Sequence, residues 1–421
     1  MKKLLCLLLA VLMLFSLCAC GDSAAEEEGE TTLSAEQKPK TQVAKPLTWD
    51  DLNSIPIANS SMTEEELRQI CLDLMRVQLS FTWTPKTEAV FYNKTRAVHL
   101  TPPIVYKGLP YKGGGEGGNG FGNIYTAMYY YDTDNGMMDL SNPNAAASIC
   151  NQCSSSVFWA WARVSNSHNY QYTIYGTQAY GCLRVGPYTY DDSITTFKQK
   201  TTEAICKENG EQTMFESYAA CKPADGLVNY KNEAGHMRMV VKVDVVRSST
   251  GSIDGQNSKL TFMDQFTPYR DYKQDNGGGY CMVSGYIDRE ISFKELYDSS
   301  YLPFTMEELN DPSKVEKAEA TIDLSGEKVT VDQLTKATVK ANYSISDITI
   351  TVKNSKGKQV YSYLFPVYTI HTIPAYEAGV IGAVVHEDLA KYENGKYTIE
   401  VSTRLGTGEK PVLYSGKLVK G

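Results

Sequence analysis

The stretch from Ala145 to Val164 constrains the fold of this chain more than any other, because it places a cysteine at the start of a buried helix. It reads AAASICNQCSSSVFWAWARV. Three serines follow Cys153, and the apolar residues after them recur at the spacing of a buried helical face, namely Val157, Phe158, Trp161 and Val164. Cys153 is therefore expected in the first turn, where unpaired backbone N–H groups and the positive end of the helix dipole favour a thiolate over a thiol.

Two roles are open for this cysteine. A thiolate at the start of a helix is a common form of nucleophilic cysteine. The alternative is a buried or disulfide-bonded structural cysteine, which is the commoner use of the residue.

The first 46 residues are interpreted as an export signal, a lipid attachment site and a stalk. Residues 1–19 hold two lysines and a leucine-rich run, which is typical of a secretory signal and too short for a stable membrane span. The run ends in Leu17, Cys18, Ala19 and Cys20, which resembles a bacterial lipobox and implies that Cys20 becomes the lipidated first residue. The alternative is a plain N-terminal transmembrane anchor. Residues 20–46 contain no aromatic residue, so we expect a flexible stalk that tethers an extracytoplasmic body to the cell membrane.

The rest of the chain is long enough for two domains, which we place at 47–312 and 313–421. The formal net charge is −8 and no basic cluster occurs, so nucleic acid is not an expected partner, because phosphate binding needs concentrated Lys and Arg. The 29 tyrosines suit a glycan or peptide groove, and they also suit ordinary half-buried strands. The oligomeric state is not predicted.

Cysteine arithmetic leaves an odd number of thiols in the mature chain. Of ten cysteines, Cys6 and Cys18 leave with the signal and Cys20 carries lipid, so seven remain. In an exported protein the even part is available for disulfides, and the leftover cysteine is a free thiol. For the CxxC pair Cys150 and Cys153, a disulfide is a further alternative, and so is a metal site with two further ligands. No second CxxC and no HxxxH occurs, so we predict no metal site and no cofactor.

Periodicity predicts the main elements of the first domain. Helices are expected over 63–79, over 197–206 and within 291–309, and strands over 237–246 and 259–266. Asp311 and Pro312 mark the boundary between the domains. The tail from Val315 contains seven short alternating segments, ATIDL, KVTV, ATVKANYS, DITITVKN, VYSYLF, KYTIEVST and VLYSGKLV, which suit an immunoglobulin-like β-sandwich.

Several short motifs between residues 101 and 266 resemble, in their order, the NlpC-type papain-like cysteine peptidases. They are a Pro-Tyr-x-Gly-Gly loop, a cysteine that starts a helix before a serine, a Lys-Pro-x-Asp turn, a Gly-His pair that opens a strand, and a polar residue on the next strand. In this chain they are Pro110, Tyr111, Gly113 and Gly114; Cys153 and Ser154; Lys222, Pro223 and Asp225; Gly235 and His236; and Asp264 or Gln265.

The resemblance implies an α+β papain-like domain, with the helix-borne cysteine packed on an antiparallel sheet. Cys153 is then the nucleophile, His236 the base, and Asp264 or Gln265 the residue that orients the base; alternation along the strand does not decide between the last two. The Cys153 backbone N–H and the Gln152 side chain are the oxyanion donors. The groove is lined by Tyr111, Gly113 and Gly114.

Two departures bear on the substrate. Members of the family have Asp before the cysteine, whereas this chain has Gln152, which is similar to the related CHAP amidases. Insertions over 116–143 and 170–221 reshape the region of the groove. The expected activity is hydrolysis of an amide or peptide bond in peptidoglycan. The alternatives are an inactive surface lipoprotein that binds wall peptides or glycans, and a transglutaminase-like acyltransferase that uses the same triad.

Overall fold

A computed structural model describes nine segments of the chain, and these form two compact units. The segments are residues 47–113, 122–142, 145–166, 182–231, 234–273, 280–367, 370–372, 375–384 and 389–421. The first unit contains the described residues up to 52, 71–160 and 170–307, and the second those of 53–70, 161–169 and 308–421. The predicted signal, Cys20, the stalk and Gly114 lie outside the described residues.

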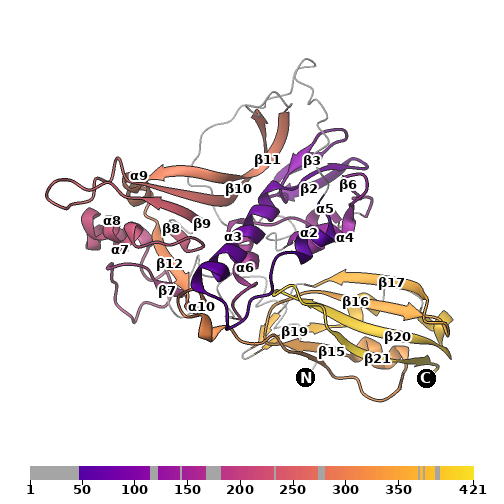
Figure 1. Cartoon of the computed structure of the whole chain (residues 1–421). Helices are drawn as coiled ribbons and strands as arrows, with labels where there is room; N and C mark the ends of the chain where they lie inside the picture. The colour runs from indigo at the N-terminus through magenta and orange to yellow at the C-terminus, as the bar shows by residue number, and fades with distance from the viewer. Residues whose placement is uncertain are drawn as a thin grey trace, which may run out of the picture. The chain divides into compact units, whose positions relative to one another are not determined.

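The first unit is built on a ten-stranded mixed sheet (Figure 1), so the α+β prediction is confirmed. Its strands are β1 Thr82–Pro85, β4 Tyr106–Lys107, β5 Tyr131–Asp132, β6 Met137–Met138, β7 Cys182–Arg184, β8 Gly226–Lys231, β9 Ala234–Asp244, β10 Lys259–Lys273, β11 Tyr280–Ser292 and β12 Leu302–Met306. Their order is β5-β6-β1-β4-β11-β10-β9-β8-β12-β7, and a separate hairpin pairs β2 Ala89–Asn93 with β3 Arg96–Leu100.

The sheet is predicted to be antiparallel, and two of its strand pairs depart from this. The pairs β1·β6 and β4·β11 are parallel, and the other neighbours are antiparallel. Both exceptions involve a strand of only two residues, β6 or β4, and in each pair the two partners are far apart in the sequence. The four long strands β8 to β11 form the antiparallel centre on which the candidate site is built.

The helices that the structure describes before residue 311 are short except for one. They are α2 Trp49–Asn53, α3 Glu64–Ser80, α4 Ile124–Tyr130, α5 Ala145–Ser148, α6 Cys153–Trp161, α7 Thr202–Asn209, α8 Glu211–Ala219, α9 Phe293–Asp298 and α10 Glu307–Asn310. The predicted helix over 63–79 is confirmed as α3, which starts with a reciprocal pair of bonds between Thr63 and Glu66. None of the helices in the described segments is long and apolar enough to cross a membrane.

Two of the predicted helices have different bounds because side chains cap them elsewhere. The helix expected from 197 begins at Thr202, since the Thr201 hydroxyl accepts the Ala204 N–H at 3.3 Å. The region 291–309 holds α9, which a Ser292–Glu295 capping box starts, and then the strand β12. All five residues of β12 are buried, and a continuous apolar run does not distinguish a buried strand from a helix.

The helix α6 begins at Cys153, as predicted, and it is buried on all sides. Its apolar residues Val157, Phe158 and Trp161 are at most 4% exposed, and so are the serines that precede them. A helix that is buried all round lies inside the fold instead of covering it. Packing therefore holds the first turn of α6 in place, in addition to its hydrogen bonds.

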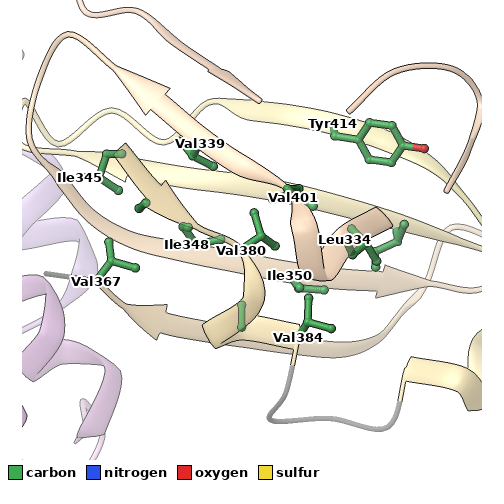
Figure 2. Packing of buried hydrophobic residues seen from close by; sticks show 14 of the residues in the cluster. Leu334, Val339, Ile345, Ile348, Ile350, Val367, Val380, Val384, Val401 and Tyr414 are labelled. Carbon is green, nitrogen blue, oxygen red and sulfur yellow. The ribbon is translucent and has the colours of Figure 1, made fainter. Parts of the chain in front are cut away.

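The second unit consists of a five-stranded and a four-stranded sheet around one apolar core (Figure 2). The strands are β13 Ala320–Ile322, β14 Lys328–Val329, β15 Thr338–Ala341, β16 Ile345–Lys353, β17 Gln359–Pro366, β18 Ile370–Thr372, β19 Ala375–Gly379, β20 Asn394–Leu405 and β21 Val412–Val419. The sheet orders are β14-β21-β20-β16-β17 and β13-β15-β19-β18. The described part of this unit also contains four short helices, η4 Pro312–Lys314, α11 Val331–Lys336, α12 Ile381–Val384 and η5 Leu389–Tyr392.

All seven segments predicted as strands in this unit contain one, but the prediction missed β18 and β19. It also extended the second strand too far, because Val331 already belongs to α11. Thr330 caps this helix and forms a capping box with Gln333.

Candidate active site

Backbone and side-chain bonds fix the loop that presents Cys153. The Asn151 side-chain oxygen accepts the Gln152 N–H at 2.8 Å, and the Asn151 amide group donates to Gln78 of α3 at 3.3 Å. Gln78 in turn donates to the Ser156 carbonyl on α6, also at 3.3 Å. Gln78 and Asn151 are both fully buried, so these bonds hold the start of α6 without competition from water.

The predicted groove loop lies beside the cysteine loop. The Asn151 N–H donates to the Pro110 carbonyl at 2.8 Å, and the Lys112 N–H donates to the Asn151 carbonyl at 2.7 Å, so Tyr111 pairs with Asn151 as a short parallel bridge. Gly113 is held by its N–H, which donates to the Asn93 side chain at 2.8 Å. The structure thus brings Tyr111 and Gly113 next to the loop that precedes Cys153.

His236 lies within β9, two residues after its start, and faces Asp264 on the neighbouring strand β10. Its Nε2 atom is 2.9 Å from Asp264 Oδ2. The imidazole also forms a hydrogen bond with the Cys153 side chain, and Nδ1 is the ring nitrogen left for it. Cysteine, histidine and aspartate therefore form one continuous chain of contacts that joins α6, β9 and β10.

The electrostatics of this chain favour a charged histidine. Burial opposes the charge of His236, but the electrostatic interactions with Tyr301 and Cys153 and the hydrogen bonds to Asp264 and Cys153 outweigh it, so its pKa lies well above the ordinary 6.5. Burial alone would raise the pKa of Asp264, but the bond and charge of His236, followed by those of Arg238, keep it below its ordinary value. The site is thus set up for an imidazolium beside an ionised carboxylate.

The structure separates the two candidates for the orienting residue. Gln265 faces the other side of the sheet, where its amide group donates to the Leu109 carbonyl at 2.6 Å and lies 3.3 Å from the Ser284 hydroxyl. Successive residues of a strand point to opposite faces, so Gln265 does not reach the imidazole that Asp264 contacts. Of these two residues, only Asp264 contacts His236.

Cys153 and Gln152 are both buried. Cys153 is 0% exposed and Gln152 is 4% exposed, whereas 15% of the His236 side chain is exposed. The Gln152 Oε1 atom has no hydrogen-bond partner among the described residues.

The structure shows no disulfide among the cysteines whose side chains it describes, although the cysteine count left disulfides open. These buried cysteines are Cys71, Cys150, Cys153, Cys182, Cys206 and Cys221. Cys150 donates its thiol to the Ala146 carbonyl at 3.0 Å, and burial raises its pKa, an effect that the charge of Lys112 only partly offsets. The two cysteines of the CxxC pair thus have different surroundings, with the imidazole beside Cys153 alone.

Sequence reasoning missed Arg238, which lies two residues after His236 on the same face of β9. Its Nε atom is 3.1 Å from Asp264 Oδ2, and its guanidinium lies over the rings of Phe262 and Tyr301 at 4.3 Å and 4.5 Å. The spacing of two residues from the candidate base was the available signal, because it places both side chains on one face of a strand.

A glycine behind Asp264 gives a stability prediction. A Cβ atom on Gly285 would lie 2.3 Å from the Asp264 carbonyl oxygen and 2.9 Å from a methyl group of Leu79. We expect Gly285→Ala to lower the free energy of unfolding by about 1–3 kcal/mol, because the strand cannot shift without moving Asp264. Thermal unfolding measures the loss. The control is Gly379→Ala, whose Cβ meets only an ordinary contact at 3.6 Å, and equal melting temperatures for the two variants would contradict the prediction.

The second unit holds a cavity of about 960 Å³ that none of the three residues of the site lines. Three cationic side chains and two carboxylates contribute to its wall, namely Arg163, Arg404, Lys410, Glu319 and Glu409. Buried Asp347 lies behind it, with Oδ2 at 3.4 Å from Arg404 Nε. The cavity is therefore a different site from the one that contains Cys153.

No protein-family model and no curated protein matches the chain. A proposal for its function therefore rests on the geometry of Cys153, His236 and Asp264.

Proposed function

We propose that this protein is a lipid-anchored, extracytoplasmic cysteine hydrolase that cleaves an amide or peptide bond in the stem peptides of peptidoglycan. The observation that carries the proposal is the contact of Cys153, at the start of α6, with His236, whose Nε2 is bonded to Asp264 at 2.9 Å. The proposed fold is a papain-like catalytic domain followed by an immunoglobulin-like sandwich. The wall substrate and the anchor at Cys20 rest on the resemblances in the sequence.

The geometry supports a two-step acyl transfer. The Cys153 thiolate attacks the carbonyl carbon, and the C–N bond breaks as the His236 imidazolium gives its proton to the leaving amine. The neutral imidazole then takes a proton from water, whose oxygen attacks the thioester and releases the acid and the thiolate. N–H groups in the first turn of a helix have no partner within that helix, so the Cys153 N–H is suited to bind the oxyanion, together with Gln152.

Asp264 makes both steps possible by fixing the imidazole. Because Asp264 Oδ2 engages Nε2, the ring presents Nδ1 to the sulfur and keeps one orientation through both proton transfers. A carboxylate in this place also stabilises the imidazolium, which an amide such as Gln265 would do less strongly.

Two alternative functions remain. The first uses the same acyl-enzyme: if the site admits an amine in place of water, the acyl group is transferred to that amine, as in a transglutaminase-like acyltransferase. The cavity with Arg163, Arg404 and Lys410 in its wall favours a surface lipoprotein that binds acidic wall peptides or glycans.

The test is to incubate the full chain, purified in mild detergent, with purified peptidoglycan of several wall types under mild reduction. Soluble fragments are identified by mass spectrometry, and the Cys153→Ala chain is the matched control. Release of stem-peptide fragments that depends on Cys153, with water added across one amide bond, is the expected result, and it identifies the bond.

Two other results would point elsewhere. Fragments joined to an added amine instead of water would establish the acyltransferase. Chain that sediments with the wall and releases no fragment, equally with and without Cys153, would contradict the hydrolase and support the binding protein.

A further inference from the structure

We infer that Arg238 is a positioning residue of the site, which fixes the Asp264 carboxylate so that this carboxylate can orient His236. The inference rests on the proposed function, since it assigns a role within the same triad. Arg238 contacts neither Cys153 nor the imidazole in any bond described here, so it acts on the chemistry through Asp264.

The position of Arg238 follows from strand register. In the antiparallel pairing of β9 with β10, Met239 lies opposite Met263, so one step further Arg238 lies opposite Asp264. Residues at i and i+2 share a face, which puts His236 on the diagonal from the same carboxylate. Two side chains of one strand therefore converge on one oxygen of the next, at 2.9 Å from His236 Nε2 and 3.1 Å from Arg238 Nε.

Two aromatic rings hold the guanidinium in place. Its central carbon lies 4.3 Å from the centre of the Phe262 ring and 4.5 Å from that of Tyr301, both of which are at most 3% exposed. A planar cation between two ring faces is stabilised by both and loses its freedom to rotate. The Arg238 side chain is only 16% exposed, so its charge acts on Asp264 with little screening by water.

Asp264 depends on these contacts because it has few others. The Asp264 side chain is 2% exposed, and its Oδ1 atom has no hydrogen-bond partner among the described residues. Both hydrogen bonds of the carboxylate in the described structure go to Oδ2, from His236 and Arg238. Removing Arg238 would leave a buried carboxylate with a single partner, and desolvation would then favour its neutral form.

Charged and titratable groups near this carboxylate come from several neighbouring elements. His236 and Arg238 lie on β9, Tyr286 pairs with Asp264 from β11, Cys153 starts α6 beside the imidazole, and Tyr301 precedes β12. Removing the Arg238 cation destabilises the ionised Asp264 carboxylate, and through the imidazolium that this carboxylate stabilises it also destabilises the Cys153 thiolate. Both changes move the acid limb of activity in the same direction, to higher pH.

The experiment measures the Cys153 thiolate directly, by the pH dependence of its ultraviolet absorbance in the full chain minus that in the Cys153→Ala chain. We expect half-formation in the unchanged protein well below the value of about 8.5 for a free cysteine. Arg238→Gln should move it up by about one pH unit, and the acid limb of kcat/KM by the same amount, which is about a tenfold loss on that limb. The KM should stay unchanged.

Matched variants separate charge from fold. Arg289→Gln is the control, because Arg289 also lies over a ring, that of Tyr286 at 4.3 Å, but has an exposed side chain. Arg238→Lys keeps the charge without the planar fork, so it should hold the acid limb in place and lower kcat several-fold; it carries the test if Arg238→Gln does not fold. In the Asp264→Asn background, Arg238→Gln should cause no further shift.

The possible failures are distinguishable. If the Cys153 thiolate forms at low pH in the unchanged protein and Arg238→Gln does not change that pH, the role of Arg238 is overturned. The proposed hydrolase function is then still supported. A transition at the ordinary value in the unchanged protein would overturn the proposed function and this inference with it.

Discussion

Replacing Cys153 with alanine should lower kcat/KM for the release of stem-peptide fragments by about a millionfold, the loss that removal of a triad nucleophile causes. The reason is that the thiolate forms the only covalent bond in the proposed mechanism. The imidazole would remain beside a methyl group, which has no electron pair to attack a carbonyl. Fragment release over time, read by mass spectrometry, measures the effect.

The chain offers a close control for this variant in Cys150. It lies three residues earlier, is equally buried, and donates its thiol to the Ala146 carbonyl. Burial raises the pKa of this thiol, so it remains protonated and unreactive. Cys150→Ala should keep the activity of the unchanged chain. An active Cys153→Ala chain, or a Cys150→Ala chain that folds but is inactive, would refute the assignment of the nucleophile.

The sequence was sufficient to place the helix that carries Cys153 and the two strands that carry His236 and Asp264. The apolar residues after the three serines of α6 recur at helical spacing, and apolar and polar residues alternate along the two strands. Only five histidines occur, which made the choice of His236 narrow. The seven short strands of the C-terminal unit were predictable for the same reason of alternation.

Contacts between segments were not predictable in this way. Whether Asp264 or Gln265 faces the imidazole depends on which side of the sheet α6 occupies, and no pattern within one strand encodes that. The role of Arg238 was not predictable for the same reason. It depends on the register of β9 with β10 and on two aromatic rings that are distant in the sequence. The possibility of disulfides rested on the number of cysteines and the exported location, neither of which says whether two thiols meet.

Replacing His236 with glutamine should lower kcat/KM by about a thousandfold or more, because the variant removes the group that holds and returns the proton. A residue of a triad acts with the others as a unit, so the double variant with Cys153→Ala should be no slower than Cys153→Ala alone. The matched control is His99→Gln on β3, whose side chain is 59% exposed and which should keep full activity. A double variant much slower than the single one would mean that His236 and Cys153 do not act together.

The same variant should reveal the charge of His236 through stability. The pKa of this imidazole is raised in the folded protein well above its ordinary value of 6.5. The contacts of the charged imidazole therefore stabilise the fold fully at a pH below that ordinary value. The contribution is lost as the pH rises through the raised pKa. The free energy of unfolding of the unchanged chain should therefore exceed that of His236→Gln most in acid solution, and the difference should shrink in alkaline solution. A difference that grows with pH would mean that the folded protein holds this histidine neutral, and the thiolate would then have no imidazolium beside it.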